Sequence, residues 1–150
     1  MKVLLLLLAL VFLTACTSSP AIYDGLFDTL ESSFWDDSVV FSVTHTERGA
    51  VLLVRLQSEE VRSLRGELIY DRGLFDVRYE KLSDWVCDYN QETRRVACAS
   101  ASPAEPGNVF RFSLVAKEGV EPGRHPLEFN VFDINGVETS VGLDTTISVR

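Results

Sequence analysis

Apolar and polar residues alternate with a period of two along most of the chain after Ser38. Alternation of this kind puts apolar side chains on one face of a β-strand and polar side chains on the other. Short polar segments rich in Gly, Pro, Asp and Asn separate the alternating runs, which is typical of antiparallel hairpins. The pattern predicts about nine strands, at residues 39–44, 52–57, 64–70, 75–81, 85–89, 95–99, 110–115, 127–132 and 147–149.

About nine short strands with one polar face each predict an all-β fold. We expect an antiparallel jelly-roll or Ig-like sandwich, in which two sheets pack their apolar faces together. Asn135-Gly136 is the strongest turn signal, because this dipeptide suits a two-residue hairpin loop. Asp133 to Gly136 also has some likeness to a calcium loop. It lacks a third oxygen ligand before the glycine and the later bidentate glutamate, so the hairpin interpretation is favoured.

The first residues predict export from the cytoplasm. Lys2 precedes an uncharged apolar run over residues 3–13, which is typical of a secretory signal and too short for a membrane span of ~20 residues. Leu13-Thr14-Ala15-Cys16 resembles the lipobox of bacterial lipoproteins. The resemblance implies cleavage before Cys16 and attachment of fatty acids such as palmitate to that cysteine. An ordinary secretory signal with a nearby cysteine is the alternative.

These features divide the chain into three parts. Residues 1–15 form the predicted lipoprotein signal peptide, residues 16–37 a tether with a short linker or helix, and residues 38–150 the sandwich domain. Between residues 22 and 35, apolar positions recur every three to four residues, so we expect a short helix or irregular segment that packs on the domain. Its acidic residues disfavour a membrane-surface helix. Thr17 after the lipidated cysteine favours the outer membrane in a Gram-negative host.

The acidic balance of the chain restricts its partners. Formal net charge is −8 for the whole sequence, and 13 basic and 22 acidic residues remain without residues 1–15. Nucleic acids need basic patches that neutralise phosphates, so we expect no nucleic-acid partner. We also expect no binding to anionic lipid beyond the anchor itself. The 9 Phe, 4 Tyr and 2 Trp provide enough apolar surface for a packed core.

Two cysteines remain after Cys16 is assigned to lipid. Cys87 and Cys98 lie on the two arms of a predicted hairpin, whose simplest register places them opposite each other and Tyr89 opposite Val96. Disulfides persist in the oxidising envelope, so we predict a structural disulfide between them. A redox-active pair is the alternative. The absence of Cys-X-X-Cys spacing and of a neighbouring cation disfavours it.

The run from Gly66 to Val77, GELIYDRGLFDV, resembles the signature segment of cohesin-like domains. Three later segments are similar to further strands and turns of that family: RVACAS at residue 95, the Phe-rich run after Pro106-Gly107, and the turn at residues 132–136. Arg72 stands where the family usually has proline. The resemblance implies a jelly-roll sandwich related to carbohydrate-binding modules. Cohesins bind dockerins in cellulosomes, although many bacterial proteins carry the fold with no known dockerin.

No catalytic constellation is present in the sequence. His45 and His125 stand alone, on the inner-face phase at a strand end and in a turn, and a structural role is expected for both. The sequence has no zinc-ligand spacing, no Gly-x-Ser-x-Gly elbow and no glycine-rich phosphate loop. We therefore predict a protein that is not an enzyme and needs no cofactor or metal.

Aromatic residues are the best binding candidates. Phe132 falls on the outward phase of its strand and Tyr79 lies near the cysteine hairpin, and exposed aromatic surface often marks a binding site. Trp85 is expected to pack in the core over the disulfide. We predict a lipid-anchored envelope protein that acts as a non-catalytic protein-binding or assembly module. A carbohydrate-binding module, or an accessory subunit that stabilises an envelope complex, is the alternative.

Overall fold

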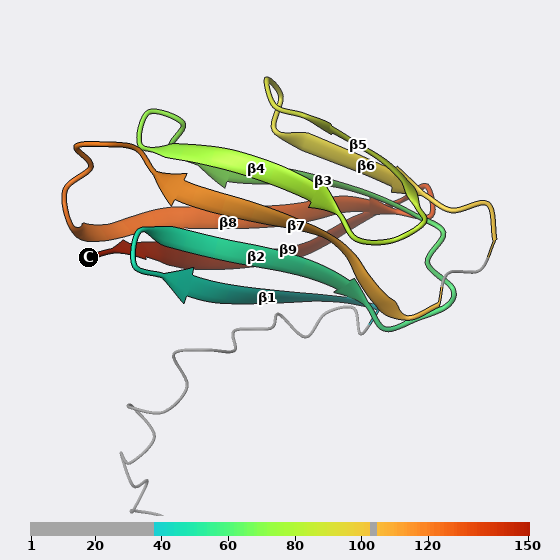
Figure 1. The fold of residues 1–150 in the computed structure, drawn as a ribbon. Coiled ribbons are helices and arrows are strands. Elements are labelled where there is room, and N and C mark those ends of the chain that lie inside the picture. Colours follow the sequence, from blue (N-terminus) through green and yellow to red (C-terminus); the bar gives the residue numbers. More distant parts are fainter. Residues whose placement is uncertain (1–37, 103–104) are drawn as a thin grey trace, which may run out of the picture.

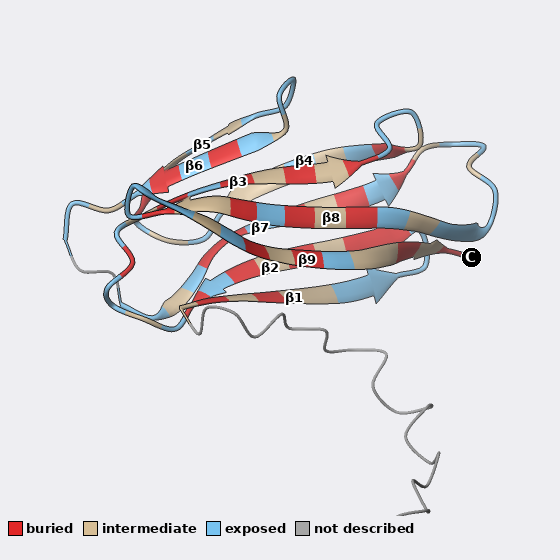
Figure 2. Cartoon of the chain, turned by 180° about the vertical axis from the view of Figure 1, so that it is seen from behind, coloured by how far each residue is buried: buried red, intermediate tan, exposed pale blue. Residues whose placement is uncertain are grey.

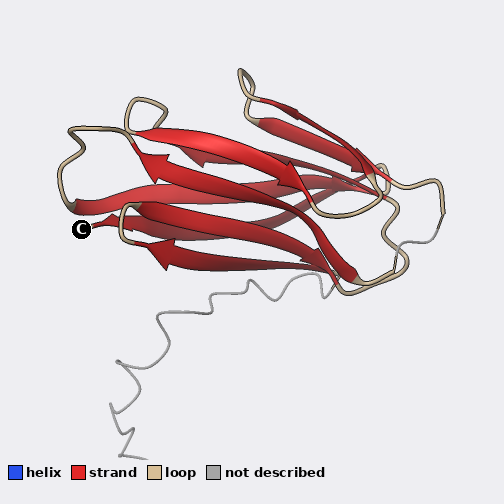
Figure 3. Ribbon diagram, viewed as in Figure 1, coloured by secondary structure: helices blue, strands red, loops and turns tan. Residues whose placement is uncertain are grey.

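A computed structural model describes residues 38–102 and 105–150 (Figure 1). The predicted signal peptide, the lipidation site Cys16 and the apolar segment at residues 22–35 lie outside this range. Within the described residues every regular element is a strand, as Figure 3 shows, and no helix is long and apolar enough to cross a membrane.

Nine strands form two antiparallel sheets in the described part of the chain, which confirms the predicted all-β sandwich. Sheet I has the order β1-β2-β7-β4 and sheet II the order β5-β6-β3-β8-β9. The strands are β1 (Val39–Thr46), β2 (Gly49–Leu56), β3 (Ser63–Tyr70), β4 (Phe75–Lys81), β5 (Val86–Asn90), β6 (Arg95–Ala99), β7 (Gly107–Ala116), β8 (Gly123–Ile134) and β9 (Val137–Val149).

The core lies between the two sheets, where alternate residues of most strands are buried (Figure 2). Phe110 and Phe112 of β7 contact Phe129 of β8, with ring centroids 6.0 and 5.8 Å apart. Gly66 of β3 makes room for the Phe129 ring, because a Cβ at this position would come within 2.7 Å of Phe129 Cζ. The aromatic contacts therefore join the sheets near their centres.

The Asn135-Gly136 turn forms as predicted. Ile134 pairs with Val137, and both intervening residues have positive φ, 57° at Asn135 and 78° at Gly136. A two-residue loop with positive φ at both positions matches the twist of the strands that it joins. The resulting β8–β9 hairpin is much longer than the sequence pattern indicated.

The prediction that His125 lies in a turn is wrong. His125 belongs to β8 and pairs with Ile147, and its ring lies 5.3 Å from that of Phe75. Pro126 suggested a turn because proline cannot donate to a β-ladder. Pairing of β8 with β3 begins only at Leu127, so at Pro126 β9 is the only partner strand and one backbone side stays unpaired.

Candidate binding surface

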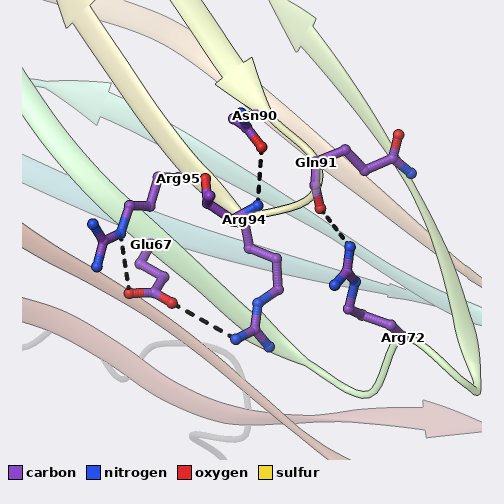
Figure 4. Close-up of polar contacts among 7 residues, drawn as sticks. Glu67, Arg72, Asn90, Gln91, Arg94 and Arg95 are labelled. Carbon is purple, nitrogen blue, oxygen red and sulfur yellow. Dashed lines mark hydrogen bonds and ion pairs between the residues drawn. The ribbon is translucent and has the colours of Figure 1, made fainter.

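The β5–β6 hairpin carries the disulfide. Cys87 pairs directly with Cys98 and Tyr89 with Val96, in the predicted register, and a disulfide joins the two cysteines. The hairpin tip is ordered by Asn90, whose Oδ1 accepts the backbone N–H of Thr93 at 2.9 Å (Figure 4). A side-chain acceptor of this kind is a common substitute for backbone pairing in a turn. The disulfide and the tip together fix the outer edge of sheet II.

The outer face of sheet II, on the side away from the core, faces solvent. We call it the Phe132 face, after the aromatic residue that it exposes near the end of β8. Strand pairing brings together a group of its outward-pointing residues, among them Val86, Asp88 and Asn90 of β5, Arg95, Ala97 and Ala99 of β6, Arg65 and Glu67 of β3, and Asn130 and Phe132 of β8.

Phe132 lies at a β-bulge between Val131 and Asp133, half-buried on this face. The guanidinium Cζ of Arg95 lies 5.6 Å from the centre of its ring. This geometry is a cation–π contact, worth about 0.5–1 kcal/mol at an exposed site. The contact places the guanidinium of Arg95 over the ring of Phe132.

Glu67 lies between two arginines on the same face. Its carboxylate oxygens are 3.7 Å from the guanidinium of Arg94 and 3.7 Å from that of Arg95, as Figure 4 shows. Ion pairs at such distances near the surface add little to stability. Their effect is on orientation, because Glu67 restrains the guanidinium that lies over Phe132.

Small and apolar side chains surround the charged group. Ala97 and Ala99 are exposed on β6, and Val86 on β5 has 78% of its surface accessible. Small side chains leave a sheet face flat, and a flat face that carries an aromatic ring and an arginine suits contact with a broad partner surface. Within the described strands, Phe132 is the one Phe, Tyr or Trp that points outward from either sheet.

Tyr79 lies elsewhere in the fold. It points inward from β4, at the side of the sandwich where β4 and β5 are the edge strands, and stacks on Tyr89 with ring centroids 5.5 Å apart. Its hydroxyl is buried with no hydrogen-bond partner among the described residues. Burial, with the carboxylate of Asp88 next in effect, raises the pKa of Tyr79 to about 12. The structure therefore does not bring Tyr79 and Phe132 together, and a binding role for Tyr79 stays a prediction.

The other candidate residues differ in burial. Trp85 is buried, as expected, just before β5. His45 follows the inward phase of β1 but is exposed, because the strand extends past the core. No group of three or more His, Cys, Asp or Glu residues that could hold a metal ion occurs within residues 38–102 and 105–150.

Two solved structures resemble the sandwich. One is CaCohA2 from Clostridium acetobutylicum, with 14% identity, a TM-score of 0.51, and a match over 75% of this chain and 90% of that one. The chain has a cohesin-like β-sandwich fold. A chain of the type I cohesin–dockerin complex Coh-OlpA–Doc918 from Clostridium thermocellum matches with 11% identity and a TM-score of 0.48, over 75% of this chain and 99% of that one. No protein-family model and no curated protein matches the sequence.

Arg72 stands where cohesin-like domains usually have proline, and the arginine makes a contact of its own. Its guanidinium donates a hydrogen bond of 2.8 Å to the carbonyl oxygen of Gln91, at the tip of the β5–β6 hairpin (Figure 4). Asp71 helps to order the same turn, since its Oδ1 accepts the Gly73 N–H at 2.7 Å. A proline at residue 72 could not make the contact with Gln91. Arg72 therefore ties the β3–β4 turn to the hairpin that borders the Phe132 face.

Proposed function

We propose that this protein is a lipid-anchored envelope protein whose sandwich is a non-catalytic protein-binding or assembly module. The Phe132 face is the proposed contact surface. The observation that carries this proposal is the Arg95–Phe132 pair, the one outward-facing aromatic platform among the described strands. Arginine and aromatic residues supply a large share of the binding energy at protein interfaces.

The cohesin-like fold supports this choice of function. The fold places the Phe132 face on a rigid sheet whose outer hairpin is closed by a disulfide and by the contact between Arg72 and Gln91. A face held in this way loses little conformational entropy when a partner binds. A dockerin domain is the first partner to test, because the sequence resemblance to cohesins implies one.

The proposed anchor sets where binding takes place. Cys16 is separated from β1 by only 22 residues, so a lipid on this cysteine would keep the sandwich close to the membrane. In a Gram-negative host we propose the outer membrane. Anchoring near a surface raises the local concentration of partners that share it.

Co-purification from detergent-extracted host envelopes tests the binding proposal. We expect the wild-type chain to retain a stoichiometric protein partner, and the Phe132→Ala variant to bind it at least about tenfold more weakly. Leu53→Ala is the matched control, since Leu53 is a half-buried apolar residue on the outer face of sheet I. Arg95→Ala should weaken binding in the same direction as Phe132→Ala.

Two results would overturn the proposal. The first is equal retention of the partner by the wild-type chain and by the Phe132→Ala and Arg95→Ala variants. The second is specific retention on a glycan array with no stoichiometric protein partner, which would favour the carbohydrate-binding alternative.

A further inference from the structure

A polar pocket lies at the end of the sandwich where the edge strands β1 and β9 meet. Arg48 forms an isolated antiparallel β-bridge with Val149, and the backbone N–H of Arg150 donates to the carbonyl oxygen of Glu47 at 3.0 Å. Figures 1 and 2 both show the last residues of β1 and β9 at this end. The pocket has a volume of about 580 Å³, which falls within the usual range for small-molecule sites.

The lining of the pocket is more basic than the chain as a whole. Arg124 of β8 and Arg150 after β9 contribute two guanidinium groups, with the imidazole of His45 beside them and Glu47 as the one acidic side chain in the lining. Neither arginine side chain makes an ion pair or a hydrogen bond within the described residues. The whole chain has a net charge of −8, so the basic lining of the pocket is opposite in charge to the protein as a whole. Two free guanidinium groups suit a carboxylate or a phosphate.

Hydroxyl groups line the rest of the pocket. Thr46 of β1 and Thr146 and Ser148 of β9 face it, and their side chains have no hydrogen-bond partner among the described residues. A hydroxyl both donates and accepts, so it complements the hydroxyls of a sugar.

We propose that this pocket binds an acidic sugar unit, a ring rich in hydroxyls that carries one carboxylate or phosphate. Arg124 and Arg150 pair with the charged group, and Thr46, Thr146 and Ser148 bond the ring hydroxyls. The proposal does not depend on the Arg95–Phe132 pair, because Arg124 lies near the opposite end of β8 from Phe132 and the pocket lining includes neither Phe132 nor Arg95.

Calorimetric titration of the full chain in detergent tests the site with glucuronate and with a glucose phosphate. Both acidic sugars should bind, and both neutral glucose and inorganic phosphate should bind at least about tenfold more weakly, since each lacks half of the recognised chemistry. A uronate oligosaccharide is the third arm. Tighter binding than the monosaccharide indicates an envelope glycan as the source, and equal binding indicates a soluble sugar acid.

Variants locate the binding. Arg124→Gln should weaken binding of glucuronate by about tenfold or more, with an unchanged melting temperature. Arg55→Gln removes the same charge from an exposed position on β2 and should leave binding unchanged, as should Phe132→Ala. The proposal is overturned if neither acidic sugar binds, if Arg124→Gln binds like the wild type, or if inorganic phosphate binds as tightly as the glucose phosphate.

Discussion

The side-chain oxygen of Asn135 accepts the backbone N–H of Arg62 at 2.7 Å, although 73 residues separate the two. The same oxygen accepts the N–H of Ser63 at 3.1 Å, and Nδ2 of Asn135 donates to the carbonyl oxygen of Glu60 at 2.9 Å. The turn between β8 and β9 therefore holds the segment that leads into β3. One residue both forms the hairpin loop and positions the strand next to it.

Replacing Asn135 by glycine should separate these two roles. Glycine keeps the positive φ that the turn needs but removes three side-chain hydrogen bonds. We expect the free energy of unfolding to fall by about 1–3 kcal/mol, measured by urea denaturation. Asn135→Asp keeps both acceptor contacts but turns a carboxylate oxygen toward the Glu60 carbonyl, so stability should fall in this variant as well. Equal stability of Asn135→Gly and the wild type would show that the long-range contacts contribute nothing.

Local pattern was sufficient for the number of strands and for two hairpins, but not for the lengths of β8 and β9. Alternation of apolar and polar residues indicates which face of a strand is buried, and it predicted β6 and the Cys87–Cys98 register. The dipeptide Asn-Gly indicates the backbone geometry of a two-residue loop, and it predicted the last turn. Both predictions needed neighbouring residues alone. The second role of Asn135 could not be predicted in this way. It depends on β3 and β8 being neighbours, which the sequence does not state.

For the candidate site too, one part could be predicted from neighbouring residues and the other part depends on the fold. The outward phase of Phe132 could be predicted from its own strand, but its contact with Arg95 depends on the order β6-β3-β8 in sheet II. The basic pocket combines the end of β1 with residues of β8 and β9, and no spacing in the sequence indicates that approach. The sequence marks Arg72 as a residue at a position where cohesin-like domains usually have proline, but its partner Gln91 is fixed only by the fold.

The Cys87–Cys98 disulfide should stabilise the sandwich without taking part in binding. It closes a short loop between directly paired strands, so the Cys87→Ala/Cys98→Ala variant should lose about 2–4 kcal/mol of stability. For a domain of this size the melting temperature should fall by roughly 5–15 °C, measured by circular dichroism. Partner binding at low temperature should survive. Free thiols in protein taken from the envelope, or unchanged melting with lost binding, would contradict this expectation.

The anchor can be tested by one substitution. Cys16→Ala removes the thiol that the lipobox resemblance assigns to lipid, so the variant should accumulate as an unprocessed or soluble precursor. Labelling cells with a radioactive fatty acid and fractionating their membranes measures both effects. The neighbouring Thr17→Ala variant should still be labelled and stay in the membrane fraction. Labelled, membrane-bound Cys16→Ala would exclude lipidation at this residue.

Ionisation of Tyr79 should lower the free energy of unfolding in alkali. Its pKa is raised to about 12 in the folded protein, mainly by burial, against 10.0 for the unperturbed side chain. Between these values the unfolded chain loses the tyrosine proton and the folded protein keeps it, so the unfolded state binds fewer protons and stability falls as pH rises. The contribution is fully present below pH 10 and is lost as the pH rises towards 12.

Urea denaturation at pH values from 8 to about 12 measures this loss. Tyr79→Phe keeps the ring that stacks on Tyr89 and removes both the ionisable group and a buried hydroxyl that has no partner. Its stability at neutral pH should equal or exceed that of the wild type, because no hydrogen bond is lost with the hydroxyl. Its stability should also fall less steeply above pH 10. An identical alkaline slope in the two proteins would show that Tyr79 is not the group responsible.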